Sequence, residues 1–486
     1  MRVLCVAGVL VAMLLASSAA GTNIVLVSVD TLRADRLPAY GYRAIRTPAI
    51  DRFRADSVLF RRAWTHCPLT APAHASMLTG LLPQQHGLRD NSGYALDRRV
   101  ATVAEQLQSR GYRTGAFVSS VVLGKEDTKL DRGFERWDET FAEGEKTRKG
   151  DATVAAALAW LDERKGRPFF LFVHTYEPHT PYEKLPGVAD AYDAEVVRSD
   201  GIVGALFDAL RSRKLYDDAL ILFTSDHGEG LGEHDEPEHG TLLYRTTLQI
   251  PLIVKLPGAA LRGKSVAADA QLIDLAPSML EHAGLPREAA RLSGMSLAKL
   301  ARSGSASRAI HAETLYPRNQ LGWHELRSVV RGDLHLIAGR RVALHDLRTD
   351  PGERVNLADA RRREAFALLQ EVKRVAAAAK RPSASTSAKT AEALQSLGYL
   401  SGGSGDETTY HPDPRDRMPI FGQQLKLMTA LRRAQYDEAL ARADAILARH
   451  PSFIEVWERK AIALLGLGRR KEAEEAVQRA MKLMRP

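Results

Sequence analysis

Over the first two thirds of the chain, short runs of apolar residues alternate with longer segments in which apolar positions follow a helical period. Apolar runs without polar interruption are typical of parallel strands that are covered on both faces. They predict strands at residues 23–29, 114–122, 168–173, 219–224 and 251–255. The periodic segments predict helices at residues 103–110, 152–164, 191–212 and 272–282. This alternation indicates an α/β domain with a mainly parallel central sheet between helical layers.

The pattern changes past residue 304. Short strand-like segments at residues 326–330, 334–338 and 342–347 predict a small, mostly antiparallel subdomain. An Ala-rich segment at residues 361–380 predicts a helix after it. Residues 381–418 are rich in Ser, Gly, Thr, Pro and Asp, which is typical of a linker, with one short apolar helix expected at residues 391–400.

The end of the chain contains an internal repeat. The segments YDEA at residues 436–439 and RKEA at residues 470–473 recur with a 34-residue offset. This pattern resembles two tetratricopeptide repeats, each a pair of helices. Two repeats are fewer than usually fold alone, so we expect them to pack on the main domain, bind a protein partner or self-associate. A helical hairpin with chance periodicity is the alternative.

The first 20 residues have the pattern of a secretory signal. Arg2 precedes an apolar run, and Ser18 and Ala20 occupy the positions that signal peptidase requires. The run is short for a membrane span, so we expect export to the periplasm or the extracellular space, with membrane anchoring if the signal is not cleaved. Export would leave Cys67 as the only cysteine and exclude an internal disulfide.

Charge changes this picture little. The chain has 68 Lys and Arg against 59 Asp and Glu, a formal net charge of +9. The basic residues are scattered, without a basic run interleaved with aromatic residues, so we expect no nucleic-acid partner. A mild attraction for anionic substrates is compatible with this balance.

Polar residues follow the predicted strands where parallel sheets bind ligands. Asp30 ends the first strand, and Asp226 and His227 follow the strand at residues 219–224. Two carboxylates and an imidazole suit one divalent ion, either Mn²⁺, Zn²⁺, Mg²⁺ or Ca²⁺. Thr70 is expected in a bend before a helix, near the helix's positive end, with its oxygen on or near the ion. The structural alternatives are helix capping by Asp30 and a simple turn at Thr70.

Metal coordination is one of the few ways to activate a threonine hydroxyl as a nucleophile. Further polar residues on loops would bind the oxygens of a tetrahedral anion, and one histidine would protonate the leaving oxygen. These candidates are Asn91, His174, His179 and His239.

Five segments in order resemble the sulfatase family of the alkaline phosphatase superfamily. They are NIVLVSVDTLRADRLPAYGY, TAPAHASMLTGLLPQQHG, PHTPY, FTSDHGEGLGEH and LHDLRTDPGERVNL. The resemblance covers residues 23–357 and implies an alkaline-phosphatase-like sandwich. It also implies metal-dependent hydrolysis of sulfate, phosphate or phosphonate esters through a covalent intermediate.

The resemblance implies three metal ligands: Asp30, Asp226 and His227. Thr70 takes the nucleophile's place, and His239 matches the position of a catalytic Lys or His. His179 matches the substrate-binding histidine of the PH-x-PY segment. Asn91 resembles an oxyanion-contacting asparagine of the phosphonate monoester hydrolases.

The departures from the family pattern concern the nucleophile. Sulfatases carry Cys or Ser followed by x-Pro-x-Arg, and that Cys or Ser is oxidised to formylglycine. Here Thr70 cannot become formylglycine, His74 stands in the Arg position as a predicted substrate contact, and Thr31 replaces the second Asp of the usual pair. A sulfated threonine cannot expel sulfate by collapsing to an aldehyde. The site therefore looks more like phosphoryl-handling members such as the lipoteichoic acid synthases.

We therefore expect an exported sulfatase-like hydrolase or transferase that cleaves small anionic esters of phosphate, phosphonate or sulfate through Thr70. A two-metal phosphodiesterase, with His174, His179 or His239 binding the second ion, is one alternative. An inactive sulfatase-like scaffold that binds partners through its repeats is the other. The expected units are a signal peptide at residues 1–20, a catalytic α/β domain at 22–304, its subdomain at 305–380, a linker at 381–418 and two repeats at 419–486.

Overall fold

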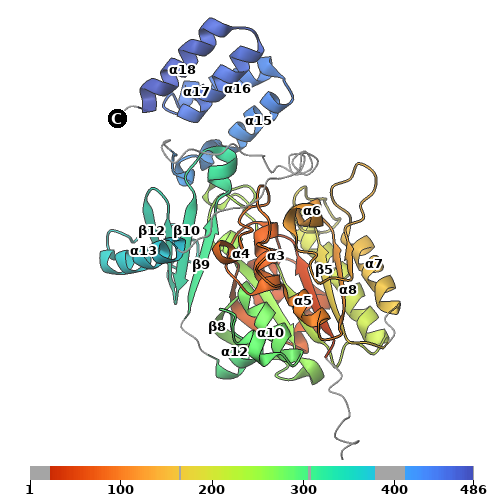
Figure 1. Cartoon of the computed structure of the whole chain (residues 1–486). Helices are drawn as coiled ribbons and strands as arrows, with labels where there is room; N and C mark the ends of the chain where they lie inside the picture. The colour runs from red at the N-terminus through yellow and green to blue at the C-terminus, as the bar shows by residue number, and fades with distance from the viewer. Residues whose placement is uncertain (1–21, 164–165, 305–307, 378–410, 485–486) are drawn as a thin grey trace, which may run out of the picture.

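An eight-stranded sheet lies at the centre of the computed structural model, which describes residues 22–163, 166–304, 308–377 and 411–484 (Figure 1). Its strands are β1 (Ile24–Val29), β2 (Val58–Trp64), β3 (Arg113–Val118), β4 (Arg136–Asp138), β5 (Phe169–Thr175), β6 (Leu220–Thr224), β7 (Gln249–Lys255) and β8 (Ser265–Gln271). They are ordered β4-β3-β5-β1-β6-β7-β2-β8. The predicted signal peptide, most of the predicted linker and the helix expected at residues 391–400 lie outside the described residues.

The sheet is mainly parallel, as the apolar runs predicted. Strand β1 pairs in parallel with both β5 and β6, so the residues that follow these three strands emerge at one edge. Strand β7 runs antiparallel to β6 and β2. The connection from β6 to β7 contains only short helical turns, and without a crossover helix the chain returns beside the strand that it left.

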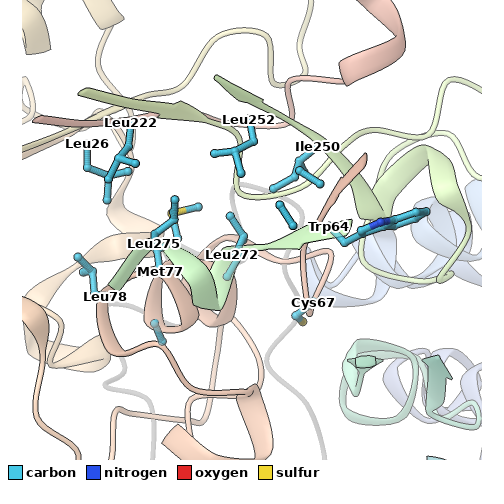
Figure 2. Close-up of a cluster of buried hydrophobic side chains, with 14 of the residues drawn as sticks. Leu26, Trp64, Cys67, Met77, Leu78, Leu222, Ile250, Leu252, Leu272 and Leu275 are labelled. Carbon is cyan, nitrogen blue, oxygen red and sulfur yellow. The ribbon is translucent and has the colours of Figure 1, made fainter. Parts of the chain in front are cut away.

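Helices cover both faces of the sheet (Figure 1). One layer contains α2 (Pro48–Ala55), α7 (Gly150–Asp162) and α8 (Ala191–Ser212), and the other contains α3 (Thr70–Thr79), α5 (Val103–Gln108), α10 (Leu275–His282) and α12 (Leu297–Ser303). Single helical turns also occur at α4 (Pro83–His86), α6 (Lys125–Thr128), α9 (Arg245–Leu248) and α11 (Pro286–Ala289). In β1, Leu26 packs against the layer that contains α3, and Val27 packs against the layer that contains α8. Because both faces of the strand are buried, its apolar residues do not alternate with polar ones. Figure 2 shows Met77 of α3 packed among Leu26, Leu222 and Leu275.

Three strands of this sheet were not predicted: β2, β8 and the three-residue β4. In β2, two arginines interrupt the apolar run, and the register of its pairing with β7 and β8 shifts at these residues. Strand β8 reads SVAADAQ, an Ala-rich sequence with low intrinsic preference for strands. Strands β2 and β8 form through pairing with each other and, for β2, with β7, which single-strand patterns do not record.

A second, antiparallel sheet follows the main domain, as expected. Its strands are β9 (Ala309–Thr314), β10 (Leu326–Arg331), β11 (Leu334–Ala338) and β12 (Val342–Asp346), ordered β12-β11-β10-β9. Helix α13 (Arg362–Ala377) packs on one face of it through Ala365, Leu368 and Val372.

The described tail contains four α-helices beyond the small sheet and α13, and Figure 1 shows them at the C-terminal end of the chain. They are α15 (Phe421–Arg432), α16 (Tyr436–Arg449), α17 (Ile454–Gly466) and α18 (Arg470–Met484). Both occurrences of the sequence repeat begin a helix, α16 and α18. The rings of Trp323 and Phe421 lie 5.8 Å apart, and Arg459 donates to the carbonyl oxygen of Leu321 at 3.1 Å, so the tail contacts the small subdomain. Within the described residues, every helix is too short or too polar to cross a membrane.

Candidate active site

Three predicted metal ligands converge at the carboxyl edge of the main sheet. Asp30 follows β1, and Asp226 and His227 follow the neighbouring β6. All three are buried, and one ligand atom from each lies within 4.8 Å of the others. His227 Nε2 is 3.5 Å from Asp226 Oδ2 and 3.8 Å from Asp30 Oδ1. Both Asp30 oxygens, Asp226 Oδ2 and His227 Nε2 have no hydrogen-bond partner among the described residues.

The electrostatics of this cluster fit a bound cation. Burial and the neighbouring charge of Asp226 raise the pKa of Asp30 well above its usual value. Burial alone would also raise the pKa of Asp226, but the nearby imidazoles of His227 and His74 outweigh it and hold the pKa low. Two buried carboxylates at this separation do not both ionise without compensation. Oxygen and imidazole donors without other partners fit one divalent ion.

Thr70 begins helix α3 rather than occupying the bend before it. Leu69 is the N-cap, and Pro72 fits within the first turn, where the helix needs no N–H from it. The Thr70 side chain is 1% exposed, and its hydroxyl oxygen has no hydrogen-bond partner among the described residues. Helix α3 is buried along its whole length, so the sheet and α10 hold this hydroxyl at a fixed place.

His74 lies behind Thr70. Its Nδ1 is 2.7 Å from the Thr70 carbonyl oxygen and 3.8 Å from Asp226 Oδ2. A carbonyl only accepts, so Nδ1 donates, and the Ser28 hydroxyl then donates to Nε2 at 2.9 Å. Burial lowers the pKa of His74 to about 3. With both nitrogens engaged inside the protein, this placement argues against the predicted substrate contact and for support of the α3 N-terminus.

His174 also lies inside, beside the metal ligands. The Ser119 N–H donates to its Nδ1 at 3.4 Å, so Nε2 carries the proton and faces Asp30 Oδ2 at 3.3 Å. Burial lowers the pKa of this imidazole to about 4. His174 therefore contacts a metal ligand, and its predicted contact with the substrate does not fit this position.

The remaining predicted histidines lie together near His227. The ring of His239 is 4.4 Å from that of His227 and 5.1 Å from that of His179. His179 stacks on Tyr176 and binds the Thr180 carbonyl oxygen through Nδ1 at 2.7 Å, which leaves Nε2 as its other polar atom. Burial lowers the pKa of His179 to about 3, and it lowers that of His239 as well.

Asn91 is held by the small subdomain. Its Oδ1 accepts from the Ala71 N–H at 2.9 Å, and its Nδ2 is buried without a partner among the described residues. The preceding Arg89 forms two 2.7 Å hydrogen bonds with Glu313 of β9. Asp90 accepts from Asn319 at 2.7 Å, and burial raises its pKa to about 6. The loop that carries Asn91 is therefore fixed by residues more than 200 positions later in the chain.

The Arg89–Glu313 pair provides a stability prediction. Both side chains are at most 7% exposed. Glu313→Ala would leave a buried guanidinium unpaired, so we expect it to lower the free energy of unfolding by about 3–5 kcal/mol. The double variant Arg89→Met/Glu313→Leu should recover most of that loss. Urea denaturation measures both, and an equal loss in single and double variants would contradict the interpretation.

Two residues near the site, Glu229 and Tyr182, were missed by sequence reasoning, and the structure also places Thr31 beside Asp226. Glu229 accepts from His239 Nδ1 at 2.7 Å, and Tyr182 donates its hydroxyl to Glu229 at 3.0 Å. Thr31 adopts a left-handed backbone, with φ 56°, and its N–H donates to Asp226 Oδ1 at 3.2 Å. Burial raises the pKa of Glu229 to about 8. For Glu229, the available signal was its place two positions after the predicted metal ligand His227.

This geometry defines an α/β enzyme with a candidate metal centre at the edge of a parallel sheet. The sulfatase family model matches residues 22–285. The chain belongs to the sulfatase family, and it is a hydrolase of that family.

Curated relatives align over much of their length. The multifunctional alkaline phosphatase superfamily protein PehA of Trinickia caryophylli is 27% identical, over 54% of this chain and 74% of the relative. Arylsulfatase A of Homo sapiens is 25% identical, over 69% of this chain and 83% of the relative. Among solved structures, the phosphonate monoester hydrolase of Agrobacterium radiobacter has a TM-score of 0.60 at 19% identity, covering 74% of this chain and 95% of that one. The structure of Ps i-CgsB has a TM-score of 0.63 at 18% identity, covering 77% and 97%. These structures share the fold.

Proposed function

We propose that this chain cleaves phosphate, phosphonate or sulfate esters through a covalent intermediate on Thr70. The observation that carries the proposal is the set of buried atoms without hydrogen-bond partners among the described residues: the Thr70 hydroxyl, both Asp30 carboxylate oxygens, Asp226 Oδ2 and His227 Nε2. The alkaline phosphatase superfamily protein and the phosphonate monoester hydrolase among its relatives support ester cleavage of this range.

Asp30, Asp226 and His227 would hold one divalent ion. The Thr31 hydroxyl, buried and without a partner, stands where the family carries a further carboxylate. The ion would lower the pKa of the Thr70 hydroxyl and withdraw charge from the ester oxygens. Neutral His74 and His174 would keep α3 and Asp30 in place without competing for the substrate.

The side chains of the site would have the following roles in the reaction. The Thr70 hydroxyl first loses its proton to solvent, and Oγ1 then forms a bond to phosphorus or sulfur while the bond to the leaving oxygen breaks. His239 donates a proton from Nε2 to that oxygen, and His179 and the Asn91 amide bind the non-bridging oxygens. Water or an alcohol then attacks the phosphorus or sulfur of the threonine ester and passes a proton to neutral His239, while the bond to Thr70 Oγ1 breaks and frees that oxygen for the next cycle. A threonine ester of sulfate lacks the aldehyde route, so we favour phosphate and phosphonate esters.

The direct experiment is a panel of aryl phosphates, phosphodiesters, phosphonates and sulfates assayed with Mn²⁺, Zn²⁺, Mg²⁺ or Ca²⁺. We expect turnover of at least one class, with retained phosphorus or sulfur on Thr70 detected by mass spectrometry after rapid quenching. Absence of turnover for every class with each ion would refute the proposal.

Removal of the ion gives a second test. Dialysis against a chelator should reduce turnover at least about 100-fold, because the nucleophile loses its activation. One equivalent of ion per chain should restore activity. Activity that survives complete removal of divalent ions would contradict the role of the three ligands.

The two-metal alternative has one supporting observation. His74, His174 and Asp226 also have ligand atoms within 4.8 Å of one another. However, His74 Nδ1 donates to the Thr70 carbonyl oxygen and has no lone pair for a metal. We therefore favour one ion, and two tightly bound ions per chain would favour the alternative.

Export and domain roles complete the proposal. We infer export from residues 1–20, and a signal that remained uncleaved would anchor the chain to a membrane. The tail at residues 419–486, whose α16 and α18 begin at the repeat positions, is proposed as two tetratricopeptide-type units that bind a protein partner or a second copy.

A further inference from the structure

The loop between His227 and His239 folds back on itself. The Gly230 N–H donates to the Glu238 carbonyl oxygen at 2.6 Å, and the Gly232 N–H donates to that of Glu236 at 2.9 Å. A Cβ atom at Gly230 would overlap both of these carbonyl oxygens, so the close approach requires glycine. This pairing brings Glu229 and His239 side by side although they are ten positions apart.

The Glu229 carboxylate is bound on both sides. Oε1 is 2.7 Å from His239 Nδ1, and Oε2 accepts from the Tyr182 hydroxyl at 3.0 Å. Glu229 is fully buried, and Arg33 holds its backbone carbonyl oxygen at 3.0 Å. The Tyr182 ring in turn packs edge-on against Tyr192 at 5.6 Å. The Glu229 carboxylate is therefore held by two side chains, those of His239 and Tyr182, and the backbone of Glu229 is held by Arg33.

We propose that Glu229 is a positioning residue that fixes the tautomer and orientation of His239, and that Tyr182 holds Glu229 in place. The proposal rests on the proposed function, in which His239 is the acid for the leaving group. A carboxylate bound to one imidazole nitrogen keeps the proton there and directs the other nitrogen toward the reaction. The acid is the imidazolium form of His239: Nδ1 donates to the Glu229 carboxylate throughout, and Nε2 passes its proton to the leaving oxygen as the ester bond breaks, which leaves a neutral imidazole protonated on Nδ1.

This role predicts an effect that depends on the leaving group. A phenolate is basic and needs the proton, whereas 4-nitrophenolate leaves without one. Glu229→Gln should lower kcat about 100-fold for the phenyl ester and less than about fivefold for the 4-nitrophenyl ester of the same acid. A purely structural effect would lower both rates equally.

Glu236→Gln is the matched control. Glu236 lies in the same loop and is also buried, but its carboxylate accepts from the backbone N–H groups of Thr241 and Leu242, at 3.0 and 2.8 Å. We expect this variant to change the two rates by the same factor. His239→Ala should also lower kcat more for the phenyl ester than for the 4-nitrophenyl ester, as Glu229→Gln does. The double variant Glu229→Gln/His239→Ala should be no slower than His239→Ala alone.

The outcomes separate this inference from the proposed function. If His239→Ala is selective for the leaving group and Glu229→Gln is not, the positioning role is wrong while the proposed function stands. If wild-type protein cleaves neither the phenyl nor the 4-nitrophenyl ester of phosphate, phosphonate or sulfate, the proposed function itself fails. Tyr182→Phe serves as the second variant if Glu229→Gln does not fold. Tyr182→Phe should lower kcat for the phenyl ester about tenfold more than kcat for the 4-nitrophenyl ester. An equal loss of kcat for both esters would overturn the inference.

Discussion

Thr70→Ala should reduce kcat by about 10⁴-fold or more, while the variant folds as wild type does and still binds its divalent ion through Asp30, Asp226 and His227. Removing the nucleophile removes the atom that forms the covalent bond, and losses of this size are typical when one member of such a catalytic set is deleted. The hydroxyl has no hydrogen-bond partner among the described residues, and α3 is held by its apolar contacts. We therefore expect the free energy of unfolding to change by less than about 1 kcal/mol.

Thr70→Ser is the matched control for this experiment. It keeps the hydroxyl and removes one methyl group, so it should retain activity within about 100-fold and still form the covalent ester. Rates with a saturating ester, together with mass spectrometry of quenched protein, measure both effects. Turnover by Thr70→Ala within tenfold of wild type would rule out Thr70 as the nucleophile.

Asp226→Asn should abolish tight binding of the ion and reduce turnover at least about 1000-fold. Asp226 Oδ1 accepts from the N–H groups of Thr31 and His227, and an amide oxygen can keep both bonds. The amide nitrogen would replace Oδ2, which faces His227 Nε2 at 3.5 Å and has no hydrogen-bond partner of its own. An NH₂ group cannot ligate a cation, so the change removes a ligand with little change in shape.

The thermal response to the ion distinguishes loss of the site from loss of the fold. An ion at 100 times its Kd stabilises the protein that binds it by about 2.7 kcal/mol. Addition of the ion should therefore raise the Tm of chelator-treated wild type but not that of Asp226→Asn. Asp200→Asn alters a buried carboxylate that binds the N–H groups of Ala49 and Ile50, and it should keep the wild-type response. A full response by Asp226→Asn would exclude Asp226 as a ligand.

Sequence patterns predicted the main sheet well because its central strands are buried on both faces. Strand β1 and helix α8 lie where the patterns placed them, and α8 has the predicted bounds of residues 191–212. The edge strand β8 was missed because an Ala-rich segment carries no strand signal without its partner. The antiparallel direction of β7 also escaped prediction, since direction depends on the path of the connection and not on the strand's own residues.

The sequence by itself determined the identity of this family and the chemistry available to it. Asp30, Asp226 and His227 each follow a strand of one parallel sheet, and parallel strands deliver their carboxyl ends to the same edge. Strand order and residue type were therefore enough to predict that these side chains meet.

Only the tertiary structure decided what each histidine does. An imidazole takes its role from the partners of its two nitrogens, and those partners come from distant segments. His74 bonds Ser28, 46 positions away, and His174 accepts from Ser119, 55 positions away, so both support the site from within. His239 acquires Glu229 only because the loop folds back at Gly230. No local pattern distinguishes a histidine that supports a site from one that acts in it, because the difference lies in which hydrogen-bond partners folding brings to the ring.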